Sequence, residues 1–179
     1  MKMRLFVSVT ILLLFSCKQK DTGIMLQDVK TQYDSVFKVS VDLIVTQSDT
    51  FSLYYTTDRS TDFAKKEPIW LTVPGKDTVQ TVTFSLPQEV SPTQLRIDFG
   101  QNKAQKDIFL KKIKLSYKSR IFEVPGTLIF SYFRPDINKT EFDATTGLIR
   151  GKFKSGIRQS PSLYPKEEPL SKKIEYLTE

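Results

Sequence analysis

The chain has 179 residues, of which 39% are hydrophobic, and a formal net charge of +7 at pH 7. This length fits one domain, or one domain with a short appendage, and 13 Phe and 7 Tyr against 7 Gly argue against a low-complexity chain. A single Cys and the absence of His exclude a disulfide within the chain, zinc sites built on these residues and catalysis by imidazole. Lys and Arg are scattered among Asp and Glu, so we expect no nucleic-acid partner.

The N-terminus has the form of an export signal. Two positive charges precede an apolar run, residues 5–15, which is shorter than the roughly 20 apolar residues of a membrane span. The run ends at Leu14-Phe15-Ser16-Cys17, which resembles the lipobox of bacterial lipoproteins, although Phe15 is bulkier than usual at its position. The resemblance implies cleavage before Cys17 and attachment of acyl chains such as palmitate to it. An ordinary secretory signal or a buried thiol is the alternative.

The residues behind Cys17 bear on the location of the protein. No Asp follows Cys17 directly, and Gln19-Lys20-Asp21 is similar to the export string of surface lipoproteins of Bacteroidota. The resemblance implies an outer-membrane lipoprotein of the cell envelope, facing either the periplasm or the exterior. Its acyl chains would make the membrane its first partner.

Strands are predicted by the pattern that follows. Apolar and polar residues alternate along five segments, which is typical of strands with one buried face. A polar stretch, residues 57–68, predicts a loop. A sixth segment, residues 108–117, changes phase at Lys111-Lys112, which predicts a β-bulge or a bend. The five alternating segments are residues 37–45, 51–56, 69–73, 82–86 and 95–99.

The pattern becomes mixed after residue 119. Residues 128–133 predict one further strand, and residues 142–149 predict a hairpin whose turn ends at Gly147. The polar, Pro-bearing residues 154–166 predict a loop.

A short helix is predicted at residues 169–177, with Pro at its first position and one apolar face. We therefore predict an all-β fold: an antiparallel, jelly-roll-like β-sandwich over residues 35–118 with a C-terminal extension over 119–179. A signal peptide at residues 1–16 and a tether at 17–34 would precede it. The apolar face of the helix consists of Leu170, Ile174 and Leu177.

Parts of the chain resemble the ligand-binding-type jelly-roll domains of bacterial extracytoplasmic proteins, many of which are linked to polysaccharides. The residues that carry the resemblance are 51–56, 95–100 and 108–115, and residues 132–147 are similar to an extension that follows such domains in Bacteroidota proteins. The resemblance implies a carbohydrate-binding-like sandwich. Because these are mostly core and turn residues, it supports the fold more than the function.

Two aromatic residues are candidates for ligand binding. Tyr54 and Trp70 are out of phase with the core residues of their strands, and an exposed aromatic ring can stack on a sugar ring. Asp58, Arg59 and Asp62 lie nearby in the sequence and could bind sugar hydroxyls. The more common alternative is that a second layer covers this face, so that both aromatic residues belong to a core.

Arg96 and Asp98 are two residues apart and therefore share one face of their strand. They form either a polar binding pair or, more often, a structural ion pair. Asp107 with Asn102 and Gln101 is a weak candidate for Ca²⁺, because the spacing matches no dedicated calcium loop. We expect no metal and no cofactor.

The leading expectation is a non-catalytic binding or assembly module of the envelope, with a glycan as the ligand. The first alternative is a structural accessory subunit that docks on an envelope protein through its terminal helix. The second is a carboxylate-dependent glycan-active enzyme, which needs two carboxyl groups roughly 5–9.5 Å apart. Its candidate carboxylates are Glu89, Glu123, Glu141 and Asp143.

Overall fold

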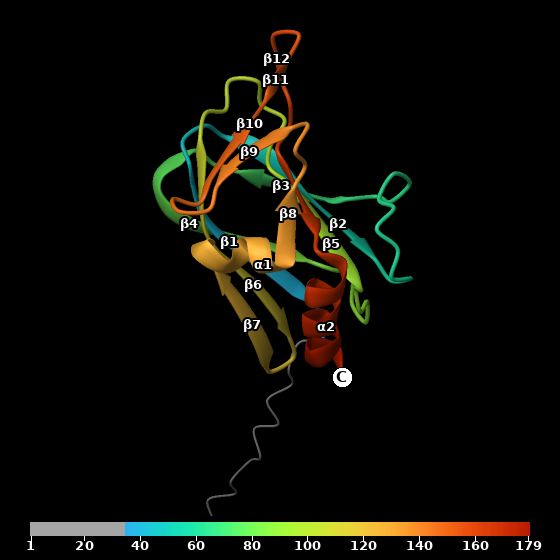
Figure 1. Cartoon of the computed structure of the whole chain (residues 1–179). Helices are drawn as coiled ribbons and strands as arrows, with labels where there is room; N and C mark the ends of the chain where they lie inside the picture. The colour runs from blue at the N-terminus through green and yellow to red at the C-terminus, as the bar shows by residue number, and fades with distance from the viewer. Residues whose placement is uncertain (1–34) are drawn as a thin grey trace, which may run out of the picture. The chain divides into compact units, whose positions relative to one another are not determined.

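The computed structural model describes residues 35–179 (Figure 1). The predicted signal peptide, the predicted acylation site at Cys17 and the predicted tether up to residue 34 lie outside the described residues. Residues 35–179 lie within one compact unit, and Figure 1 shows two facing sheets with a helix, α2 (Glu167–Thr178), beside one end of them. The fold is an all-β sandwich with a C-terminal helix, as the sequence predicts. Within the described residues, no helix is both long and apolar enough to cross a membrane.

The first sheet is antiparallel along its whole path, and β6 is at its centre. One edge of β6 pairs with β1, whereas its other edge pairs first with β10 and then with β7. The strands of this sheet, in spatial order, are β4 (Lys76–Ser85), β1 (Lys38–Val45), β6 (Ile108–Tyr117), β10 (Leu148–Gly151) and β9 (Thr140–Asp143), with β7 (Arg120–Pro125) added on β6.

The second sheet is also antiparallel and combines early and late strands of the chain. In both sheets, three neighbouring strands come from residues 35–118 and the strands of residues 119–179 are added beside them, so the late residues complete the same sandwich. The strands of this sheet, in spatial order, are β3 (Ile69–Val73), β2 (Asp49–Thr56), β5 (Gln94–Asp98), β13 (Ser162–Pro165) and β8 (Phe133–Pro135).

Alternation along the strands builds the core between the sheets. In β2, for example, Phe51 and Leu53 are at most 1% exposed and face inward, whereas Tyr54 faces the other side. Helix α2 adds its predicted apolar face, Leu170, Ile174 and Leu177, to the same core. Each such side chain contributes about 1.5–3 kcal/mol through removal of apolar surface from water.

The predicted irregularity in residues 108–117 is confirmed as a β-bulge. Asp42 of β1 pairs with Lys112 and Leu43 pairs with Leu110, so Lys111 has no partner on β1. The extra residue lets Ile108 and Leu110 point into the core on one side of the bulge and Ile113 on the other.

Residues 128–133 are not the strand that the sequence predicts. They form a 3₁₀ turn, η1 (Gly126–Leu128), a single helical turn, α1 (Ile129–Tyr132), and only then β8. An unbroken apolar run does not distinguish a helix from a strand, and here packing decides. Ile129 is fully buried, while Tyr132 packs edge-on against Phe122 of β7.

Residues 154–166 are not simply a loop. They include β13 and most of a small hairpin. This hairpin consists of β11 (Phe153–Lys154) and β12 (Ile157–Arg158), and its turn residues Ser155 and Gly156 have positive φ. Figure 1 shows this hairpin projecting from the end of the sandwich opposite α2. Strand β13 shows no clear alternation because it is only four residues long and contains Pro165. Strand β7 was not predicted from the sequence because it also lacks a clear alternation.

Candidate functional site

The candidate ligand-binding residues predicted from the sequence fall into two places. Tyr54, Arg96 and Asp98 lie together on the outer face of the second sheet, where Tyr54 is directly opposite Arg96. Trp70 is on the same face, opposite Ser52 of β2. Asp58 and Arg59 lie instead in the loop that follows β2.

Arg96 and Asp98 form the structural ion pair that was one of their two predicted roles. The guanidinium donates from Nε and Nη2 to the two carboxylate oxygens at 2.8 and 2.6 Å. Its Cζ lies 4.8 Å from the ring centroid of Tyr54 and 4.6 Å from that of Tyr164 of β13, so the cation is in contact with two aromatic rings. Tyr164 was missed by sequence reasoning because its segment was predicted to be a loop.

Phe63 covers this cluster. Its side chain comes from the loop between β2 and β3, is only 3% exposed, and lies edge-on to Tyr54 and Tyr164 at 6.4 and 6.0 Å. The side chains of Arg96 and Asp98 are left 14% and 13% exposed. A second layer therefore covers this part of the face, and it consists of the loop between β2 and β3.

Burial acts on the charges of the cluster. Burial works to lower the pKa of Arg96, but the hydrogen bond and the charge of Asp98 outweigh it and raise that pKa above the ordinary value. Burial also raises the pKa of the Tyr164 phenol. The cluster therefore holds a permanent cation whose hydrogen-bonding partner is already present. Trp70, which is 48% exposed, remains the accessible aromatic residue of this face.

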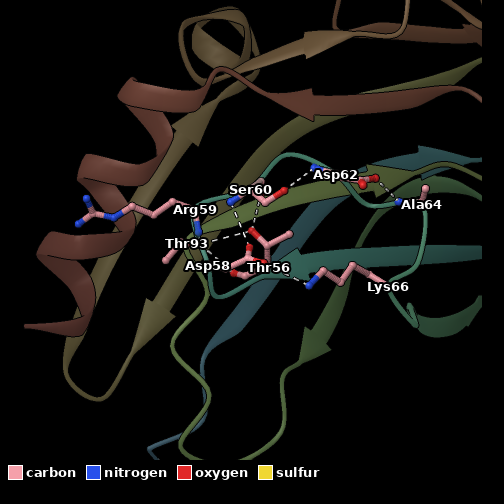
Figure 2. Close-up of polar contacts among 8 residues, drawn as sticks. All are labelled: Thr56, Asp58, Arg59, Ser60, Asp62, Ala64, Lys66 and Thr93. Carbon is pink, nitrogen blue, oxygen red and sulfur yellow. Dashed lines mark hydrogen bonds and ion pairs between the residues drawn. The ribbon is translucent and has the colours of Figure 1, made fainter.

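A groove lies between α2 and the segment that enters β5, with a volume of about 400 Å³. Arg59 projects from the loop toward α2 across it (Figure 2). On the helix side the groove presents hydroxyl and charged groups, and the buried residues Pro92 and Ile174 lie behind its lining. The remaining lining residues are Ser91, Thr93, Gln94, Glu168, Ser171, Lys172, Glu175 and Thr178.

The loop end that carries Arg59 is held by short hydrogen bonds (Figure 2). Thr56 Oγ1 donates to the Ser60 carbonyl at 2.7 Å, and the Arg59 N–H donates to Thr93 Oγ1 at 2.9 Å. Arg59 itself has φ of +61°, an unusual value for a residue with a side chain. These bonds fix the backbone from which the Arg59 side chain extends.

Asp58 stabilises the same turn rather than lining the groove. Its carboxylate accepts the Ser60 N–H at 3.1 Å and lies 3.6 Å from Lys66 Nζ. The Ser60 hydrogen bond, followed by the charge of Lys66, holds the pKa of Asp58 below its ordinary value. Figure 2 also shows the next turn of the loop, in which Asp62 accepts the Ala64 N–H.

The charges of the groove are paired with each other. Arg59 Nη2 lies 3.5 Å from Glu175 Oε1, and Lys172 Nζ lies 2.6 Å from Glu168 Oε1. The hydrogen bond from Lys172 lowers the pKa of Glu168. At the base, Gln94 is 3% exposed; its Nε2 donates to the Glu167 carbonyl, whereas its Oε1 has no hydrogen-bonding partner.

The other carboxylate candidates lie apart from this groove. Asp107, the weak calcium candidate, forms a two-bond pair with Arg150 at 2.6 and 2.8 Å, and that hydrogen bonding lowers its pKa. Among residues 35–179, no group of three or more metal-ligating side chains comes together. Asn102 and Gln101 donate backbone N–H groups to Asp49.

Of the four carboxylates considered for glycoside hydrolysis, Glu123 pairs with Lys112 at 3.3 Å and Glu141 lies 3.8 Å from Arg150. Asp143 accepts hydrogen bonds from the Thr146 hydroxyl and the Thr145 N–H, which lower its pKa. The fourth, Glu89, is exposed in the turn between β4 and β5. None of the four lines the groove.

Comparison with protein-family models, characterised proteins and solved structures gives no match to this chain. Function must therefore be argued from the side chains themselves. The groove at α2 was missed from the sequence except for Arg59. The sequence feature that could have indicated the groove is the polar face of the predicted helix, opposite Leu170, Ile174 and Leu177.

Proposed function

We propose that this protein is a non-catalytic binding module of the cell envelope and that it holds a glycan in the groove between α2 and the segment entering β5. The observation that carries the proposal is the composition of the groove. It combines hydroxyl and charged groups on both walls with apolar atoms between them, as expected for a site that must contact both the hydroxyls and the C–H groups of a sugar.

Arg59 is the side chain best placed to change partners. Its ion pair with Glu175 joins side chains that are 79% and 57% exposed, and such a pair contributes at most about 1 kcal/mol. A sugar hydroxyl can therefore replace one partner at little cost. Across the groove, Ser171 and Thr178 of α2 add hydroxyl groups to the helix wall.

The state of the carboxylates favours binding over catalysis. A general acid for glycoside hydrolysis needs a raised pKa, whereas the pKa of Glu168 in the groove is lowered by Lys172. Asp143, one of the candidates for such chemistry, has its pKa lowered as well. Both carboxylates are therefore poor proton donors near neutral pH.

The proposal is tested by screening the full chain on a glycan array and measuring the best ligand by calorimetry. Arg59→Asn removes the guanidinium while tolerating a positive φ, and Ser171→Ala removes one hydroxyl from the helix wall. We expect Arg59→Asn to weaken binding at least tenfold and Ser171→Ala to weaken it several-fold. Trp70→Ala, on the outer face of the second sheet, is the control and should leave affinity unchanged.

The opposite result would place the site elsewhere. If Trp70→Ala abolishes binding and Arg59→Asn does not, the glycan binds the outer face of the second sheet and the groove is not the site. If no glycan is retained, the binding proposal fails.

The accessory-subunit alternative is favoured by one observation. Tyr176 of α2 and Ile121 of β7 are 61% and 59% exposed, and Arg120 stacks over the Tyr176 ring at 5.5 Å. A helix that exposes an aromatic residue to solvent is suited to docking on a protein. Co-purification with an envelope protein that is lost in Tyr176→Ser, without any glycan retention, would support this role instead.

A further inference from the structure

A second pocket lies at the base of the β11–β12 hairpin, with a volume of about 380 Å³. It is formed by the loop between β5 and β6, the end of β10 and the first residues of the hairpin, at the end of the sandwich opposite α2 (Figure 1). Four cations and a single carboxylate line it. The charged lining residues are Lys103, Lys106, Asp107, Arg150 and Arg158.

Arg158 is the unusual member of this set. It is only 8% exposed, and within residues 35–179 its side chain donates one hydrogen bond, from Nη1 to the Asn102 carbonyl at 3.3 Å. Its Nε and Nη2 are buried without a hydrogen-bonding partner, and no carboxylate in residues 35–179 forms an ion pair with it. A buried cation in this state is unfavourable unless an anion joins it.

The acid whose charge acts on Arg158 does not meet this need. Asp49 is also buried, but one of its oxygens accepts the backbone N–H groups of Thr50, Gln101 and Asn102. Burial lowers the pKa of Arg158, and the charge of Asp49 only partly offsets this effect. The protein therefore exposes Arg158 to the field of a negative charge but gives two of its donors no acceptor.

Two further cations of the pocket have no ion pair. Lys103 and Lys106 are exposed and form no ion pair within residues 35–179, whereas Arg150 is occupied by Asp107. A planar guanidinium with free donors and two flexible ammonium groups can bind a group with several anionic oxygens. A phosphate offers at least three such oxygens and up to two charges, whereas a carboxylate offers two oxygens and one charge.

We propose that this pocket binds a phosphate group through Arg158, Lys103 and Lys106. The site is separate from the groove at α2 and does not depend on the proposed glycan function. Phe153, which is 69% exposed, also lines the pocket. On the other face of the hairpin Ile157 is 52% exposed, and Ile137, whose backbone carbonyl accepts a hydrogen bond from Lys152, is 73% exposed.

The Phe153 side chain bears on the source of the phosphate. A phosphate carried by a lipid would place acyl chains against Phe153, whereas a soluble phosphate would leave this ring untouched. The two sources share the chemistry of the pocket and are distinguished by the ligand used in the test.

The test is a calorimetric titration of the full chain with inorganic phosphate and, in a second arm, with dihexanoyl phosphatidic acid below its micelle concentration. Lys103→Ala/Lys106→Ala should weaken binding at least tenfold, and Arg158→Gln should abolish it. Lys65→Ala/Lys76→Ala, which removes the same charge from exposed sites outside the pocket, should change the affinity less than twofold.

The Lys103→Ala/Lys106→Ala variant keeps the proposal testable even if Arg158→Gln fails to fold. Equal affinities for this variant and its control, or no saturable binding in either arm, would overturn the proposal. If Phe153→Ser weakens only the phosphatidic acid titration, the pocket serves a lipid phosphate. If Phe153→Ser changes neither titration, it serves a soluble one.

Discussion

Arg96 and Arg158 occupy contrasting surroundings in the same sandwich. Arg96 has a two-bond carboxylate partner, two aromatic rings in contact and a covering Phe, so the protein itself satisfies the cation. Arg158 is buried more deeply yet lacks a carboxylate and leaves two donors unpaired. The difference shows that burial of a charge is not enough to indicate a binding site. A buried charge indicates one only where the protein leaves it without a partner.

The largest expected effect tests whether Arg96 depends on its partner. Asp98→Ala leaves a largely buried guanidinium unpaired, and the free energy of unfolding should fall by about 3 kcal/mol, as when one member of a buried ion pair is removed. Urea unfolding measures the loss. A change below about 1 kcal/mol would mean that solvent screens the pair and that Arg96 does not depend on Asp98.

Loss of Phe63, which covers the Arg96 cluster, should lower the free energy of unfolding nearly as much. Phe63→Ala removes a side chain that is 3% exposed and contacts two tyrosine rings. We expect a loss of about 2–3 kcal/mol, somewhat less than for a rigid core site because the loop can partly collapse. Urea unfolding and hydrogen exchange of residues 57–68 would report it. Unchanged exchange would show that Phe63 does not hold the loop.

Replacing the unpaired arginine should have the opposite sign. Arg158→Met keeps an unbranched side chain of similar length and removes a buried charge, so we expect a gain of about 1 kcal/mol in buffer without phosphate. In wild type, phosphate should raise the melting temperature, and this increase should vanish in the variant. A destabilised Arg158→Met would indicate that the charge of Asp49 already satisfies Arg158.

The smallest effect concerns pH. Hydrogen bonds from Arg150 lower the pKa of Asp107 below its ordinary value of 3.8, so the pair contributes stability that is present above that value and lost as the pH falls through the lower, folded pKa. Asp107→Asn should therefore flatten the fall in stability below about pH 4, by less than about 1 kcal/mol because the pair is partly exposed. Melting curves from pH 5 to pH 2.5 test it, and parallel wild-type and variant profiles would contradict it.

The strands of the sandwich were predictable where one face of the strand is exposed to solvent. Strands β1, β2 and β6 alternate clearly, and even the bulge at Lys111 is visible as a change of phase. The prediction failed where elements are short or where packing decides, as in α1 and β13. The candidate site shows the same limit. Arg96 and Asp98 were paired correctly from their spacing, but Tyr164, Gln94 and Arg158 reach their sites through contacts between segments far apart in the sequence.

The position of β13 has a consequence for how the molecule assembles. Ser162 pairs with Asp98 and Pro165 pairs with Phe133, so this late segment lies between two earlier strands of the second sheet. The second sheet cannot form fully until residues 162–165 have been synthesised, and pairing across such sequence distances slows folding. A chain that stops before residue 160 therefore leaves the edge of β5 without its neighbour and open to aggregation.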